Sequence, residues 1–222
     1  MSAVVDTFAG GDPYRIGHPA HERGHEATGH GEGGPASPRV IVGYGFWIFL
    51  LSDIVMFSCF FAAYAVLHTA TAQGPTSQQL FEPRRVAIET ACLLASSFTC
   101  GLASIAAHAR KQWCTQLALL ATGLLGAAFL LLEVSEFRGL VAQGAGPGRS
   151  AFLSSFFALV GCHGLHVTAG LLWLGTMMAQ FLAKGFRADI QRRMLCFSLF
   201  WHTLDIIWVA IFTVVYLIGL AS

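Results

Sequence analysis

Five long apolar segments, separated by short polar connectors, limit what this chain can fold into. A helix needs about 20 apolar residues to cross a hydrocarbon core of about 30 Å, and each segment is long enough to do so. Only 11% of the residues are charged, whereas a soluble domain usually has about a quarter. We therefore expect an all-α membrane protein with five transmembrane helices, at about 44–67, 86–107, 116–136, 152–182 and 196–220.

The composition argues against several other classes. The formal net charge of +1 gives no basic footprint for nucleic acid. No internal repeat is visible, which disfavours inverted-repeat transporter folds. The six cysteines form no Cys-x-x-Cys pair, so we interpret them as small buried hydrophobes rather than as a disulfide framework or a zinc site. They are Cys59, Cys92, Cys100, Cys114, Cys162 and Cys196.

Residues 1–43 form a polar tail that is rich in His, Gly and Pro. Its apolar content is too low to fold, so we predict a disordered tail. The histidines in it have no accompanying cysteine and no fixed spacing, which favours a solvated segment over a metal site. These histidines are His18, His21, His25 and His30. The first apolar run begins only near Tyr44, so we expect no cleavable signal peptide.

The distribution of Lys and Arg predicts how the chain is oriented in the membrane. Nine of these residues lie in the tail and in the connectors 108–115 and 183–195, which share one side of the membrane. Four lie on the opposite side. Because positive residues favour the cytoplasmic side, we expect a cytoplasmic N-terminus and a periplasmic C-terminus.

Ionisable side chains inside the apolar segments are the candidate functional residues. A charge near the bilayer centre costs at least about 2.5–3.5 kcal/mol, so each should face protein and find a partner. Asp53 is about 14 Å along its helix, and His163 and His166 are about 16–21 Å along theirs, on one face. The full set is Asp53, Glu89, Glu133, Glu136, His163, His166, His202 and Asp205.

Three roles are open for these residues. The first is structural, as hydrogen-bonded joints between helices and to a partner; we expect Asp53 to pair with His163, His166 or His202, and Glu136 to anchor the end of its helix. The second is haem ligation, which needs two imidazoles on different helices at equal depth. His163 and His166 share one helix, and His202 lies close to an end of its own. The third is a proton path in a transporter, with Asp53 as the carrier. The structural role is favoured.

Four motifs also occur in order along the chain. They are Ser52-Asp53, Glu133-Val-Ser-Glu136, His163-Gly-Leu-His166-Val and Trp201-His202-x-x-Asp205-x-x-Trp208. Together they resemble subunit III of haem-copper oxidases over about residues 40–220. Cytochrome c oxidase members generally have seven helices and a glutamate at the position of Asp53. Five helices and an aspartate look like the quinol-oxidase branch of the family, the cytochrome o type.

The resemblance implies a non-catalytic subunit in a bacterial inner membrane. In that family subunit I holds haem b, haem o and copper, and the complex oxidises ubiquinol, reduces oxygen to water and pumps protons. The expected partners are subunits I, II and IV and membrane phospholipids, held in a cleft between helices. No catalytic, cofactor or metal residue is then expected in this chain. The alternatives are an independent proton-coupled transporter and a haem-carrying electron carrier.

Overall fold

The computed structural model describes residues 38–72 and 82–217. This part of the chain contains five helices long and apolar enough to cross a membrane, as the sequence predicts. The helices are α1 (Pro38–Leu67), α3 (Pro83–His108), α4 (Gln112–Ala142), α5 (Ala151–Lys184) and α6 (Ala188–Ile211), and the π-helical turn η1 (Phe212–Leu217) continues α6.

The helices begin earlier, and several end later, than the apolar segments alone indicate. α1 begins at Pro38, so the last residues of the predicted 1–43 tail are helical, and α6 begins at Ala188 rather than near residue 196. Polar residues extend these helices beyond the apolar segments, because the helical backbone keeps its internal hydrogen bonds where it leaves the lipid. The prediction of disorder for residues 1–37 lies outside the described residues, as does the end of the predicted 196–220 segment beyond residue 217.

Short connectors with specific end residues make neighbouring helices antiparallel. The Ser150 hydroxyl caps α5 by accepting a hydrogen bond from the Leu153 N–H at 3.2 Å. Gly185 ends the same helix with φ +66°, a left-handed conformation that suits glycine. Between α3 and α4 the chain reverses over three residues, 109–111. Such short links bring successive helices into contact.

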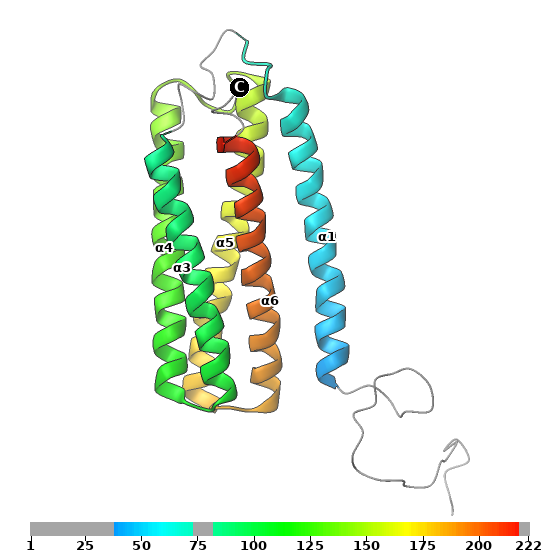
Figure 1. Ribbon diagram of the computed structural model, residues 1–222, viewed down its shortest axis with the longest axis vertical. Helices are drawn as coiled ribbons and strands as arrows, with labels where there is room; N and C mark the ends of the chain where they lie inside the picture. Colours follow the sequence, from blue (N-terminus) through cyan, green and yellow to red (C-terminus); the bar gives the residue numbers. More distant parts are fainter. Residues whose placement is uncertain (1–37, 73–81, 218–222) are drawn as a thin grey trace, which may run out of the picture. The chain divides into compact units, whose positions relative to one another are not determined.

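Four of the helices form a closed bundle, and α1 lies beside it (Figure 1). The closely packed pairs are α3–α4, α4–α5, α5–α6 and α3–α6. α1 meets α5 mainly through aromatic side chains, with ring centroids 5.8 Å apart for Phe46 and Trp173 and 6.1 Å apart for Tyr64 and Phe152. The Phe152 N–H also donates to the Ala70 carbonyl at 3.3 Å, which ties the end of α1 to the start of α5.

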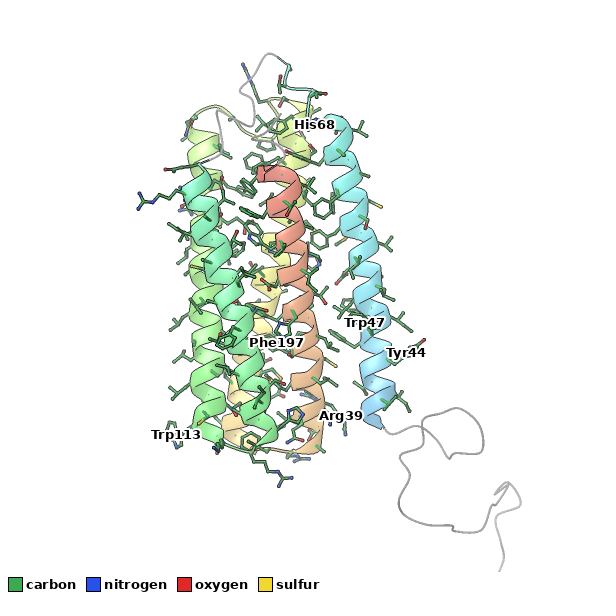
Figure 2. All side chains as sticks on the ribbon, viewed as in Figure 1. Arg39, Tyr44, Trp47, His68, Trp113 and Phe197 are labelled. Carbon is green, nitrogen blue, oxygen red and sulfur yellow. The ribbon has the colours of Figure 1, made fainter. Side chains whose placement is uncertain are left out.

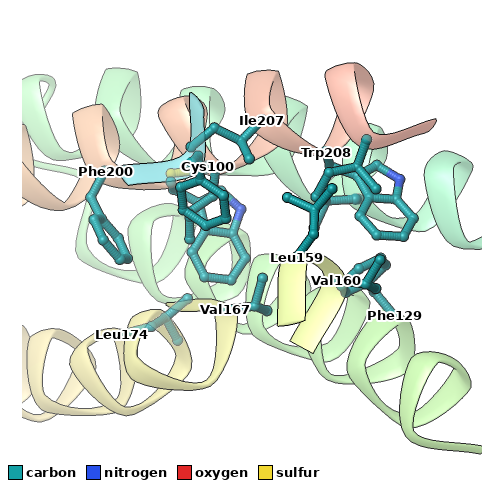
Figure 3. Close-up of a cluster of buried hydrophobic side chains, with 14 of the residues drawn as sticks. Cys100, Phe129, Leu159, Val160, Val167, Leu174, Phe200, Ile207 and Trp208 are labelled. Carbon is teal, nitrogen blue, oxygen red and sulfur yellow. The ribbon is translucent and has the colours of Figure 1, made fainter. Parts of the chain in front are cut away.

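The core lies between the four bundle helices (Figure 3). Phe129, Val160, Val167 and Trp208 are almost completely buried there, together with Cys100 of α3. All six cysteines are free thiols. The expectation that they are buried is wrong for two, because Cys59 and Cys114 lie on the outer surface of the helices.

The outer surface of the bundle is apolar, as a lipid-facing surface should be. Large aromatic side chains are exposed near one end, where Figure 2 shows Arg39, Tyr44 and Trp113. Tyr44 is 68% exposed and Trp113 is 81% exposed. Tyrosine and tryptophan are enriched where a membrane meets water, so these two side chains mark an interface level.

Candidate functional site

Three carboxyl groups are buried between α3 and α4, near the end where α3 begins. Glu89 is 0% exposed, Glu133 2% and Glu136 7%. Glu133 and Glu136 are three residues apart and share one face of α4. Because α3 and α4 are close neighbours, Glu89 of α3 faces them and interacts electrostatically with both. We call Glu89, Glu133 and Glu136, with Arg85 and Tyr216, the carboxylate cluster.

Arg85 joins the two helices that carry the carboxylate cluster. Its Nε lies 3.6 Å from Oε1 of Glu89 in an ion pair. The guanidinium also donates to the Leu132 carbonyl at 2.9 Å and to the Ser135 hydroxyl, both on α4. On the other side of the cluster the Tyr216 hydroxyl of η1 donates to Oε2 of Glu136 at 3.5 Å. The cluster therefore connects α3, α4 and the end of the last helix.

Several oxygens of the cluster lack hydrogen bonds within the described residues. They are both carboxyl oxygens of Glu89 and Oε2 of Glu133. A buried polar atom left in this way costs about 1–3 kcal/mol. A cavity of about 130 Å³ touches Arg85 and Glu136, and it is also lined by Glu82, Gly139, Leu140 and Gln143. It has room for water, which can hydrate this side of the cluster.

A second group of polar side chains joins α3 to α6. The Ser97 hydroxyl and Nδ1 of His202 are 2.7 Å apart, and Asp205 interacts electrostatically with His202. His202 and Asp205 are only half-buried. Oδ1 of Asp205 has no hydrogen-bond partner in the described part of the chain. We call Ser97, His202 and Asp205 the α3–α6 polar cluster.

Two tryptophans of α6 donate hydrogen bonds to hydroxyl groups of α3. Nε1 of Trp201 donates to the Ser96 hydroxyl, and Nε1 of Trp208 donates to the Thr90 hydroxyl, both at 3.1 Å. We did not expect a role for the hydroxyl residues of α3 from the sequence. The spacing of these residues could have indicated the two contacts. Thr90 and Ser96 are nearly two turns apart on α3, and Trp201 and Trp208 are nearly two turns apart on α6, which runs antiparallel to α3.

The two histidines of α5, His163 and His166, have different surroundings. Both ring nitrogens of His163 lack hydrogen-bond partners in the described residues, and the ring packs against Trp208 at 5.2 Å and Phe129 at 5.8 Å between centroids. Nδ1 of His166 instead lies 2.8 Å from the carbonyl oxygen of Cys162 on its own helix. The two imidazoles are thus held by aromatic packing and by the helix backbone.

Asp53 does not make the pairing that we expected. In the described structure it is half-buried and forms no hydrogen bond to His163, His166 or His202. The physical reason is that His202 is engaged with α3 and His166 with its own helix. α1 also meets α5 mainly through aromatic side chains. Asp53 interacts electrostatically with Cys162 of α5 instead.

The described polar side chains thus act as joints between helices, and they can hold protons and hydrogen bonds. Within residues 38–72 and 82–217, no group of three or more His, Cys, Asp or Glu side chains is arranged to hold a metal ion. A family model described as "Cytochrome c oxidase subunit III" matches residues 23–220, a range that includes all five helices. The chain belongs to this family.

Relatives within the subunit III family match 79–99% of this chain. The "Cytochrome bo(3) ubiquinol oxidase subunit 3" of Pseudomonas aeruginosa is 51% identical over 99% of each chain. The protein of the same name from Pseudomonas putida is 49% identical over 79% of this chain and 84% of its own. The "Quinol oxidase subunit 3" of Bacillus subtilis is 44% identical over 80% of this chain and 87% of its own. These similarities confirm the resemblance to the quinol-oxidase branch.

Proposed function

We propose that this chain is subunit III of a cytochrome bo(3)-type ubiquinol oxidase in a bacterial cytoplasmic membrane. The complex oxidises ubiquinol, reduces oxygen to water and translocates protons. The chemistry takes place in subunit I, which carries haem b, haem o and copper. This chain contributes no catalytic group, and it stabilises subunit I within an assembly that also includes subunits II and IV.

The 51% identity to a subunit 3 of a ubiquinol oxidase carries this proposal, and the α3–α6 polar cluster indicates where a partner subunit would bind. The side chains of His202 and Asp205 are half-exposed at membrane depth. A charge facing lipid at this depth costs at least about 2.5–3.5 kcal/mol, whereas a neighbouring protein helix with a donor group removes most of that cost. We therefore assign this face of α3 and α6 to the contact with subunit I.

The space between α1 and α6 fits the expected phospholipid. A cavity of about 320 Å³ lies there, lined mostly by apolar side chains that include Trp47, Phe57, Phe61 and Ile207. Because α1 packs loosely on the bundle, an acyl chain in this cavity would fill space that protein side chains leave open. Lipid bound here would hold α1 in place.

The proposed orientation puts the N-terminus in the cytoplasm and the C-terminus in the periplasm. The end of the bundle where α1 and α6 begin carries Arg39, Lys111, Arg187, Arg192 and Arg193. Positive residues in short loops favour the cytoplasmic side. Cys114 is exposed near the same end, so a membrane-impermeant thiol reagent should label it in inside-out vesicles and not in intact spheroplasts.

The contact with subunit I can be tested by changing the exposed polar groups of α6. The complex is purified through a tag on this chain, and haem is measured per chain. Asp205→Leu and His202→Leu should lower the haem recovered per chain severalfold, because the partner's polar groups then face an apolar surface. Thr176→Val is the matched control, since Thr176 is also exposed at membrane depth and its hydroxyl donates to the Trp173 carbonyl of its own helix, at 2.7 Å. Full haem recovery in both leucine variants would contradict the assigned contact face.

The proton-coupled transporter is the competing function. It predicts that the chain alone, reconstituted in liposomes, moves a solute in response to a pH gradient. The subunit proposal predicts no such transport. It also predicts that ubiquinol-driven oxygen consumption depends on the presence of this chain during assembly.

A further inference from the structure

The carboxylate cluster contains more acidic groups than nearby positive charge. Among the described residues, Arg85 is the cation that interacts with Glu89 and Glu136, and three carboxyl groups share its neighbourhood. Fully ionised, the cluster would carry a net charge of about −2 inside a membrane-spanning bundle, where ions are costly. The charge count therefore requires that protons neutralise part of the cluster.

Within residues 38–72 and 82–217, the other elements packed around the cluster bring no second cation. The titratable groups that they contribute are Tyr216 of η1 and Tyr64 of α1, both with neutral hydroxyl groups, and the acidic Glu82, which interacts with Glu136. α5 contributes the backbone at Gly164, where a Cβ atom would lie 2.6 Å from Oε1 of Glu133. The nearby His163 packs its ring between Phe129 and Trp208.

Of the three carboxyl groups, Glu133 has the fewest neighbouring groups that would stabilise a negative charge. Its side chain is 2% exposed, one oxygen rests against Gly164, and the other lacks a hydrogen-bond partner within the described structure. Glu89, by contrast, lies 3.6 Å from the Arg85 guanidinium, and Glu136 accepts a hydrogen bond from Tyr216. A proton is therefore best placed on Glu133.

Water has access to the other side of the cluster. The cavity of about 130 Å³ is lined by Arg85 and Glu136 of the cluster and also by Glu82 and Gln143. Glu82 and Gln143 are both exposed at the end of the bundle. Glu136 lines this cavity and Glu133 does not. The proton of Glu133 therefore passes first to the neighbouring Glu136 carboxylate, so that one carboxyl O–H bond breaks as another forms. Glu136 then releases the proton to water, which leaves its carboxylate beside Arg85 and Tyr216.

We propose that Glu89, Glu133 and Glu136 form a proton-binding site that holds protons at neutral pH and exchanges them with water through the cavity beside Arg85. The site goes beyond the supporting role proposed above. It rests only on the interior of this chain and not on the contact with subunit I. Its ligand is the proton, and its opening lies at the end of the bundle where α3 begins.

Infrared difference spectroscopy of the intact oxidase tests whether the site holds protons. At neutral pH the complex should show a protonated carboxyl C=O band that shifts in D₂O, and Glu133→Gln should remove it. Asp189→Asn is the control, because Asp189 is an exposed carboxylate at the opposite end of the bundle, paired with Arg187 at 3.3 Å. A band that survives in Glu133→Gln, Glu89→Gln and Glu136→Gln alike would overturn the proposal. So would carboxylate bands at neutral pH that shift when calcium or sodium is added, since the cluster would then bind a cation.

A second variant tests the cavity as the route. A Cβ at Gly139 would meet no described atom within 4 Å, so the side chain in Gly139→Leu starts in open space and would occupy part of the cavity that Gly139 lines. The D₂O shift of the carboxyl band should then become at least several-fold slower, with the band itself retained. Gly101→Leu is the control, because Gly101 is equally open and does not line this cavity. An unchanged exchange rate in Gly139→Leu would overturn the assigned route.

Discussion

The indole ring of Trp201 lies directly on the backbone of Gly126, so that a Cβ atom there would be 2.9 Å from two ring carbons. Another part of the same ring meets Gly170 of α5, where a Cβ would again lie 2.9 Å from a ring carbon. The indole N–H donates to Ser96 of α3. One side chain of α6 thus contacts the other three helices of the bundle, and small residues make this possible.

Gly126→Ala should destabilise the bundle by about 1–3 kcal/mol, since the added methyl group forces the buried indole out of its position. The measurement is the midpoint of denaturation of the purified complex in a detergent titration. Gly101→Ala and Gly175→Ala are the controls, because a Cβ at either position meets no described atom within 4 Å. Equal midpoints for all three variants would contradict the tight packing of Trp201.

The Trp208–Thr90 hydrogen bond should be measurable by a double-mutant cycle. Trp208→Phe and Thr90→Val each remove one partner of the 3.1 Å contact between α6 and α3. Interhelical hydrogen bonds in membranes average about 0.6 kcal/mol, with a maximum of about 1.7 kcal/mol, and we expect a coupling energy in that range. Strictly additive effects of the two substitutions on the free energy of unfolding would show that the bond contributes nothing.

Arg85→Gln should be severely destabilising, by about 3–5 kcal/mol, because it leaves Glu89 buried beside other carboxyl groups without its ion-pair partner. Adding Glu89→Gln should restore most of the loss, since the double variant has no uncompensated charge at this position. The readout is the amount of assembled oxidase in the membrane together with its denaturation midpoint. A double variant as unstable as Arg85→Gln alone would indicate that Arg85 acts mainly through its bonds to α4.

Phe57→Ala should loosen α1. Phe57 is buried, packs on the His166 ring at 5.3 Å between centroids and lines the cavity against α6. Removal of a buried phenylalanine side chain costs about 3–5 kcal/mol, and few other contacts hold α1. We expect faster proteolysis of α1 in the detergent-solubilised complex and less copurified phospholipid. Val55→Ala is the control, because Val55 lies on the exposed side of the same helix, and similar proteolysis of the two variants would contradict this role of Phe57.

The number and approximate position of the helices could be predicted because the apolar segments match the thickness of a bilayer. Helical periodicity also gave the depth of each ionisable residue and the face that it occupies. It could not give the neighbours of each helix. We therefore expected Asp53 to pair with His163, His166 or His202, whereas His202 lies beside Ser97 of α3. The burial of Glu133 and Glu136 agrees with the idea that intramembrane acids face protein.

The hydroxyl residues of α3 were missed for a physical reason. Serine and threonine in helices usually bond to a carbonyl of their own helix, as Thr90 does to Val86 and Ser96 to Leu93. Such residues look satisfied from the sequence alone. Only the arrangement of α6 beside α3 shows that the same hydroxyl groups also accept hydrogen bonds from Trp208 and Trp201.

Affinity purification of this chain from its native membrane, followed by optical and metal analysis, tests the proposed function most directly. We expect haem and copper to copurify with the chain in a complex that consumes oxygen in the presence of ubiquinol. The chain, once dissociated from that complex, should show no haem absorption. A haem spectrum in the isolated chain, or recovery of the chain from native membranes without any metal-bearing partner, would contradict its assignment as a supporting subunit.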